Sequence, residues 1–130
     1  MNIRYLLPIL LLAGCQTVEM TFEEGINPEV YFHRAQSAVD LKDYASALVI
    51  YQKFIDTNPT DLSYIVSAEY EIGFIQYKLG KNEEALVWLK KVEARYEDPS
   101  QISFLPAWPR SLASKIIGKI LPEVSSTEQK

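Results

Sequence analysis

The chain has 130 residues, which is room for one domain, and 48% of them are hydrophobic and 12% aromatic, which is enough to build a folded core. This composition excludes global disorder, and the formal net charge of −4 argues against nucleic acid as a partner. The only cysteine, Cys15, excludes an internal disulfide and a cysteine metal cluster.

The N-terminus predicts a removable leader. An apolar run over residues 5–13 is far shorter than the ~20 residues that a membrane-spanning helix needs. The run ends in Leu12-Ala13-Gly14-Cys15, which resembles the lipobox of bacterial lipoproteins. The resemblance implies a signal peptide over residues 1–14, cleavage before Cys15, and acyl chains on Cys15 that anchor the protein in a membrane. An ordinary secretory signal with a chance cysteine is the alternative.

The residue after the cysteine bears on the choice of membrane. Gln16 is not the aspartate that retains lipoproteins in the inner membrane of enterobacteria. The resemblance therefore implies the periplasmic side of the outer membrane, with the inner membrane as the alternative. Residues 15–27 are predicted to be the lipidated cysteine and a flexible tether.

Start and stop signals predict a helical domain over residues 28–121. Asn27-Pro28 begins a helix to about Leu41, and a second helix from Tyr44 to about Asp56 ends before Asn58-Pro59. A third helix is predicted from about Asp61 to Leu79, followed by Gly80 in the left-handed conformation. A fourth helix is predicted to be capped by Asn82 and to end at Asp98-Pro99. A last helix is predicted from Trp108-Pro109 to about Leu121, where Pro122 stops it. Residues 122–130 are predicted to be a disordered tail.

The two predicted hairpins repeat each other. Aligning Ala47 with Ala85, an offset of 38 residues, also aligns Ala35 with Gly73. The small residues are expected where the helices cross. The pattern resembles the tetratricopeptide repeat, which implies an all-α fold of two tetratricopeptide hairpins, about 28–59 and 61–97, plus a C-terminal capping helix, about 109–121. Because 38 exceeds the usual ~34, the third helix should be about one turn longer than the first.

The capping helix is predicted to cover the open end of the stack with one apolar stripe. Leu112, Ile116 and Ile120 lie four residues apart on that stripe. The other face has the basic residues Arg110, Lys115 and Lys119.

No catalytic arrangement is visible in the sequence. The only histidine, His33, has no evident nucleophile or metal-binding companion, and no phosphate-binding loop is present. We therefore expect a binding protein without a cofactor or metal, and a hydrolytic enzyme is the distant alternative.

The first helix of each repeat predicts a protein-binding groove. In tetratricopeptide repeats these helices supply the inner surface, and the corresponding groove residues here are Phe32, Gln36, Val39, Tyr70, Phe74 and Tyr77. Aromatic side chains give a large contact area at modest entropy cost. The alternative is that the capping helix covers this stripe, using Leu112 and Ile116.

A closer family resemblance covers about residues 28–97. A lipobox and a short tether are followed by three segments that resemble the BamD-type outer-membrane assembly lipoproteins. These segments are Ala47 to Thr60, Glu71-Ile72-Gly73 and Leu79 to Leu86. This implies a scaffold of the β-barrel assembly machinery, whose partners are outer-membrane assembly subunits or unfolded outer-membrane proteins. This chain has two repeats where larger members have about five. An adaptor for cell-wall coordination, or for secretin or pilus piloting, is the alternative.

Overall fold

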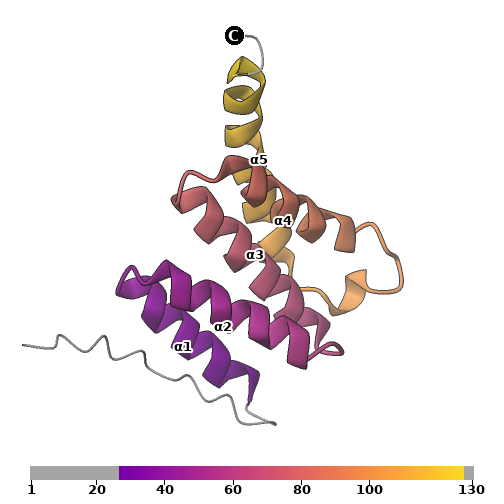
Figure 1. Cartoon of the computed structure of the whole chain (residues 1–130). Helices are drawn as coiled ribbons and strands as arrows, with labels where there is room; N and C mark the ends of the chain where they lie inside the picture. Colours follow the sequence, from indigo (N-terminus) through magenta and orange to yellow (C-terminus); the bar gives the residue numbers. More distant parts are fainter. Residues whose placement is uncertain (1–26, 128–130) are drawn as a thin grey trace, which may run out of the picture.

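The computed structural model describes residues 27–127, and every regular element in that range is helical (Figure 1). The predictions for residues 1–26, including Cys15, lie outside the described residues. The elements are α1 (Pro28–Asp40), α2 (Tyr44–Thr57), α3 (Leu62–Lys78), α4 (Asn82–Arg95), a 3-10 turn η1 (Ile102–Phe104) and α5 (Ala107–Thr127). The predicted all-α architecture of two hairpins and a C-terminal helix is confirmed.

Side-chain caps explain where three of the helices begin. The Asn27 side chain accepts a hydrogen bond from the Glu29 N–H at 3.0 Å, ahead of proline at the first helical position. Asp43 accepts from the Ser46 N–H at 3.1 Å and so caps α2. In α3, Asp61 has the same role.

The predicted cap of α4 is wrong by one residue. Lys81 is the N-cap, without a side-chain cap bond, and Asn82 is the first helical residue. The preceding turn is the cause, because the Lys81 N–H donates back to the Gln76 carbonyl at 2.9 Å while the Lys81 carbonyl already accepts from the Ala85 N–H at 2.9 Å. Glu83 and Glu84 do lie in the first turn, as predicted.

Both hairpins turn in the same way. Gly80 has a φ of 73°, which confirms the predicted left-handed conformation, and the aligned residue Lys42 has a φ of 60°. The Asp43 N–H donates to the Ala38 carbonyl at 2.8 Å, which matches the bond between Lys81 and Gln76. The two hairpins therefore have the same turn, with a lysine at the left-handed position in the first and a glycine, which favours that conformation, in the second.

The small residues do lie at close helix crossings. A Cβ atom on Gly73 would come within 2.8 Å of the Leu89 Cδ2 atom and within 3.2 Å of the Trp88 Cβ atom. Ala35, Ala47 and Ala85 have no exposed surface. The third helix has 17 residues and the first has 13, which confirms the extra turn of about four residues.

The last helix differs from its prediction in two ways. Ile116 and Ile120 of the predicted stripe are buried against α3 and α4 as expected, but Ala113 and Ile117 are buried beside them and Leu112 is 37% exposed, so the buried face is centred one residue away from the predicted one. The prediction that Pro122 stops the helix is also wrong, because α5 continues through Pro122. The carbonyl that loses a helical N–H partner belongs to Gly118, which is exposed, and solvent access at Gly118 makes the proline tolerable.

Two hydrophobic clusters share α3. The first joins α1, α2 and α3 around Tyr51, Phe54 and Ile75, and the second joins α3, α4 and α5 around Leu89, Val92 and Ile120. In Figure 1, α3 accordingly lies between the first hairpin and α4, with α5 beyond. None of the helices in residues 27–127 is both long and apolar enough to cross a membrane.

Candidate protein-binding site

The six residues of the predicted groove, the inner stripe, do not share one environment. Phe32 and Val39 pack against the first cluster, and Phe74 and Tyr77 pack against the second. Gln36 is exposed, and its Nε2 donates to the Asp40 carboxylate at 3.2 Å. The structure therefore places the stripe along α1 and α3 with different accessibility from residue to residue. Binding by these residues stays a prediction.

The terminal helix covers one member of the inner stripe. Tyr70 is only 7% exposed, and its ring meets the Trp108 ring edge to face with centroids 5.2 Å apart. Phe74 stacks on Tyr70 at 6.1 Å and stays half-buried. The alternative that the terminal helix covers the stripe thus holds at Tyr70, through Trp108, and Ile116 is buried in the same cluster as Tyr70, whereas Leu112 is 37% exposed. Phe74 and Tyr77 keep part of their surface open.

A carboxyl group lies beside this stripe without a compensating charge. Glu71 is half-buried, and no basic side chain in residues 27–127 forms an ion pair with it. Burial raises the pKa of Glu71 to about 7. Burial, and then the charge of Glu71, raise the pKa of Tyr70 to about 12. The Glu71 carboxyl therefore changes between its protonated and ionised forms around neutral pH.

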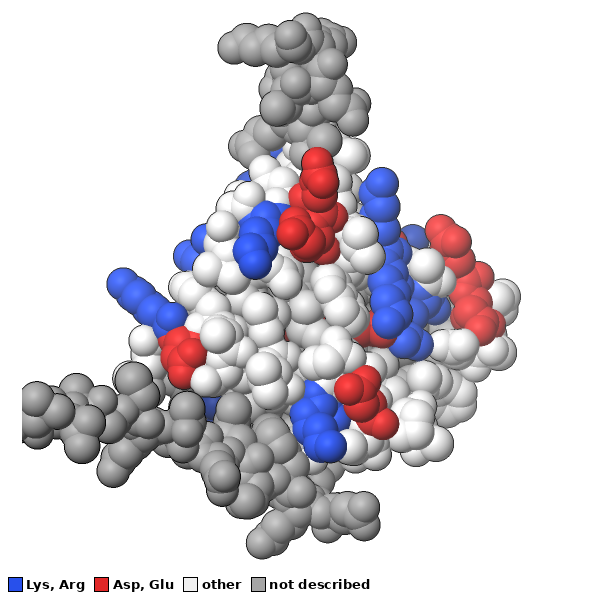
Figure 2. Space-filling view, in the orientation of Figure 1, with Lys and Arg blue, Asp and Glu red and all other residues white. Residues whose placement is uncertain are grey.

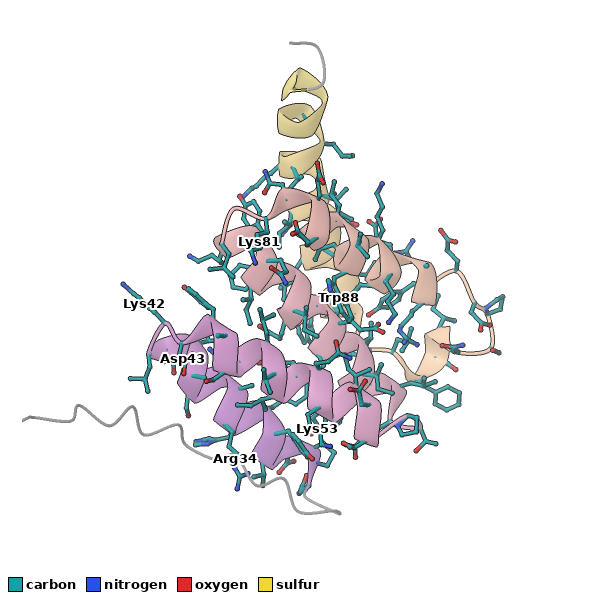
Figure 3. All side chains as sticks on the ribbon, viewed as in Figure 1. Arg34, Lys42, Asp43, Lys53, Lys81 and Trp88 are labelled. Carbon is teal, nitrogen blue, oxygen red and sulfur yellow. The ribbon has the colours of Figure 1, made fainter. Side chains whose placement is uncertain are left out.

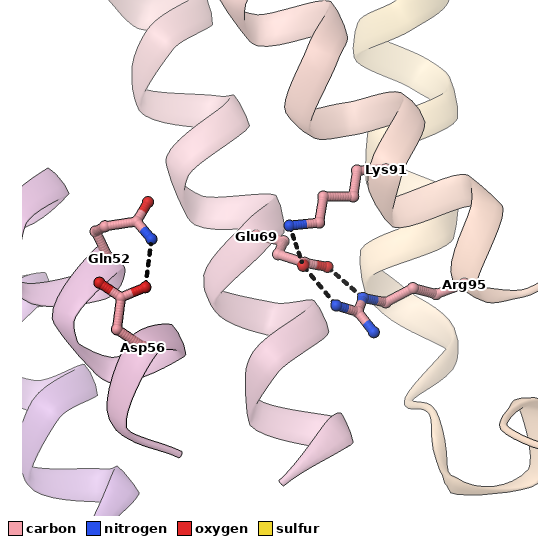
Figure 4. Close-up of polar contacts among 5 residues, drawn as sticks. All are labelled: Gln52, Asp56, Glu69, Lys91 and Arg95. Carbon is pink, nitrogen blue, oxygen red and sulfur yellow. Dashed lines mark hydrogen bonds and ion pairs between the residues drawn. The ribbon is translucent and has the colours of Figure 1, made fainter. Parts of the chain in front are cut away.

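Two residues earlier in the same helix, a carboxylate is fully compensated. Glu69 has no exposed surface, and it accepts hydrogen bonds from Arg95 Nε at 2.5 Å and Arg95 Nη2 at 2.6 Å (Figure 4). Lys91 Nζ lies 3.0 Å from the Glu69 Oε1 atom. Successive turns of α4 thus supply both cations, which joins α3 to α4 in the second hairpin.

Sequence reasoning missed three of these features. It assigned no role to Glu69, Glu71 or Trp88, although a glutamate inside an otherwise apolar helix is a signal that its environment will be unusual. Trp88 is half-buried, and Lys91 Nζ lies 4.9 Å from its ring centroid. The pairing of Glu69 with Arg95 spans 26 residues, so no local pattern could reveal it.

The described residues offer little for catalysis or metal binding. Within residues 27–127, no group of three or more histidine, cysteine, aspartate or glutamate side chains is placed to hold a metal ion. His33 is exposed on α1. The arrangement of apolar and aromatic side chains along paired helices is suited to contact with another protein.

Comparison with known proteins supports this interpretation. The tetratricopeptide repeat family model matches residues 29–61, which cover α1, α2 and the turn into α3. No curated protein and no solved structure matches the chain. Tetratricopeptide repeats generally bind proteins, and their fold is typically a non-catalytic scaffold. The chain contains a tetratricopeptide repeat, and the fold that follows it continues the same helical stacking.

Proposed function

We propose that the protein is a lipid-anchored scaffold on the periplasmic side of the outer membrane that binds other proteins as an accessory subunit of the β-barrel assembly machinery. The observation that carries the binding role is the tetratricopeptide match over residues 29–61, on a hairpin whose stacking α3, α4 and α5 continue. The anchor rests on the lipobox at Cys15, and the process rests on the resemblance to the BamD-type lipoproteins.

The exposed part of the inner stripe is the first surface to test. Phe74 and Tyr77 are half-buried aromatic residues on α3, and Gln36 is exposed on α1. Such residues can contact an extended or helical segment without prior unfolding of the core. Tyr70 is a poor choice for a test because its removal would open a cavity against Trp108.

Affinity isolation of the native lipoprotein from its own cells tests the proposed process. We expect a barrel-assembly subunit or an outer-membrane protein precursor among the recovered partners. A Phe74→Ala, Tyr77→Ala double variant should recover at least tenfold less of these partner proteins than the wild type does. The control variant Val87→Ala, at a 68% exposed residue on α4, should recover as much of them as the wild type. Helicity measured by circular dichroism must be unchanged in both.

Other partners would contradict the assignment. Recovery of cell-wall, secretin or pilus components in place of barrel-assembly subunits would favour the adaptor alternative. For the anchor, Cys15→Ala should move the protein from the membrane fraction to the soluble fraction. Unchanged membrane association in that variant would refute lipidation at Cys15.

A further inference from the structure

A second candidate binding surface lies away from the inner stripe, between the second helices of the two hairpins. We call it the outer groove, and it is a hollow of about 500 Å³ whose floor is α3, with α2 and α4 as its walls. Its lining includes Leu48, Val49, Ile72, Gln76 and Trp88. Figure 3 marks Trp88 on α4 and Lys53 on α2, which lie on either side of it. A hollow of this size can hold several side chains.

The outer groove offers an apolar surface to solvent. Val49 is 55% exposed on the α2 wall, and Trp88 is half-buried on the α4 wall. In Figure 2 this face of the molecule has an uncharged middle with charged side chains around it. An apolar centre with a polar rim is the arrangement found in protein interfaces.

The two walls of the outer groove differ in charge. On the α2 wall, Lys53 contributes one positive charge and Asp56 one negative charge, so this wall has no net charge. On α4, Lys91 and Arg95 both pair with the single carboxylate of Glu69, which leaves one surplus positive charge (Figure 4). Lys91 is 48% exposed and lies against the Trp88 ring, so that surplus is located at the edge of the groove. An acidic side chain beside Lys91 would complement it.

We propose that the outer groove binds an amphipathic helix of a partner protein, with apolar side chains between Val49 and Trp88 and an acidic side chain beside Lys91. A groove bounded by two helices accepts a third by packing ridges into grooves. This inference rests on the proposed protein-binding function and adds the chemistry of one partner.

A displayed library of helical peptides, selected against the full chain, measures the proposed specificity. The enriched peptides should have apolar residues at helical spacing and an acidic residue on one flank. Val49→Glu should weaken their binding at least tenfold, and the control Val87→Glu, on the same protein at another exposed valine, should not. Lys91→Ala should weaken binding more than Lys90→Ala. Equal binding to Val49→Glu and Val87→Glu would overturn the proposal.

Photo-crosslinking in cells distinguishes failure of this inference from failure of the proposed function. A photoreactive residue at position 49 should capture an amphipathic segment of a partner, and one at position 87 should not. Capture from position 36 or 74 alone would refute the outer groove while the scaffold function stands. Absence of capture at all of these positions would count against both.

Discussion

Replacement of Glu71 by glutamine should stabilise the protein, and the gain should depend on pH. Glu71 is half-buried without an ion-pair partner in residues 27–127, and burial raises its pKa from an ordinary 4.5 to about 7. Between these two values the folded protein binds more protons than the unfolded chain does. The stability that neutral Glu71 contributes is therefore complete below pH 4.5 and is lost as the pH rises through 7.

The size of the effect follows from the two pKa values. The difference between 4.5 and about 7 corresponds to about 3 kcal/mol, because one pKa step is worth ~1.4 kcal/mol. Solvent contact of the half-buried carboxyl reduces the expected gain in unfolding free energy at pH 8 to about 1–3 kcal/mol. For a domain of this size, each kcal/mol raises the melting temperature by roughly 4–8 °C.

Urea unfolding at pH 5, 6, 7 and 8 checks this prediction. Glutamine is close in shape to the protonated carboxyl, so the variant and the wild type should differ least at pH 5, diverge steadily between pH 5 and 7, and change little further at pH 8. Glu84→Gln is the matched control, because Glu84 is exposed in the first turn of α4, and it should show no such gain. A difference between Glu71→Gln and wild type that stays constant across the pH range would refute the reasoning.

Three further predictions concern stability measured by chemical unfolding. Gly73→Ala should cost about 1–3 kcal/mol, because the new Cβ atom would lie 2.8 Å from Leu89, whereas Gly118→Ala, with open space around it, should gain about 0.5–1 kcal/mol; equal effects at the two glycines would contradict the close crossing. Lys42→Gly should raise the free energy of unfolding by up to about 1 kcal/mol because Lys42 has a φ of 60°, and Gly80→Ala should lower it by about as much. A loss of stability in Lys42→Gly together with a gain in Gly80→Ala would show that the turn does not need the left-handed conformation. Arg95→Ala should cost about 3 kcal/mol because it leaves Glu69 buried with one cation, while Lys91→Ala, at a 48% exposed side chain, should cost less than about 1 kcal/mol; a larger loss for Lys91 would reverse the assigned importance of the two cations.

The secondary structure could be predicted closely because its signals are local. Asn27-Pro28 begins α1 through a cap and a preset φ, and Gly80, which follows α3, adopts the left-handed conformation that glycine tolerates better than other residues do. The repeat offset of 38 residues also fixed which helices pair, since Gly73 and Ala85 mark a crossing that larger side chains would prevent. These features depend on a few neighbouring residues each.

The errors occurred where neighbours from another helix decide the outcome. Pro122 looked like a stop, yet an exposed Gly118 one turn earlier lets α5 continue. Leu112 was predicted to be buried with Ile116 and Ile120, but α5 presents Ala113 and Ile117 to α3 and α4 and leaves Leu112 37% exposed. A stripe of apolar residues predicts that a helix has a buried face, and only packing fixes its centre.

The candidate sites divide in the same way. The sequence by itself determined an all-α chain of two stacked hairpins and predicted the residues of the inner stripe. Helical periodicity and small residues at helix crossings can be recognised within short segments of sequence, which is why these features were predictable. The tertiary structure decided which residues of that stripe stay accessible, why Glu69 is ion-paired while Glu71 has no ion-pair partner in residues 27–127, and that Gln76 and Trp88 meet in the outer groove. Charge compensation and concavity arise between helices that are distant in sequence, so no local pattern contains them.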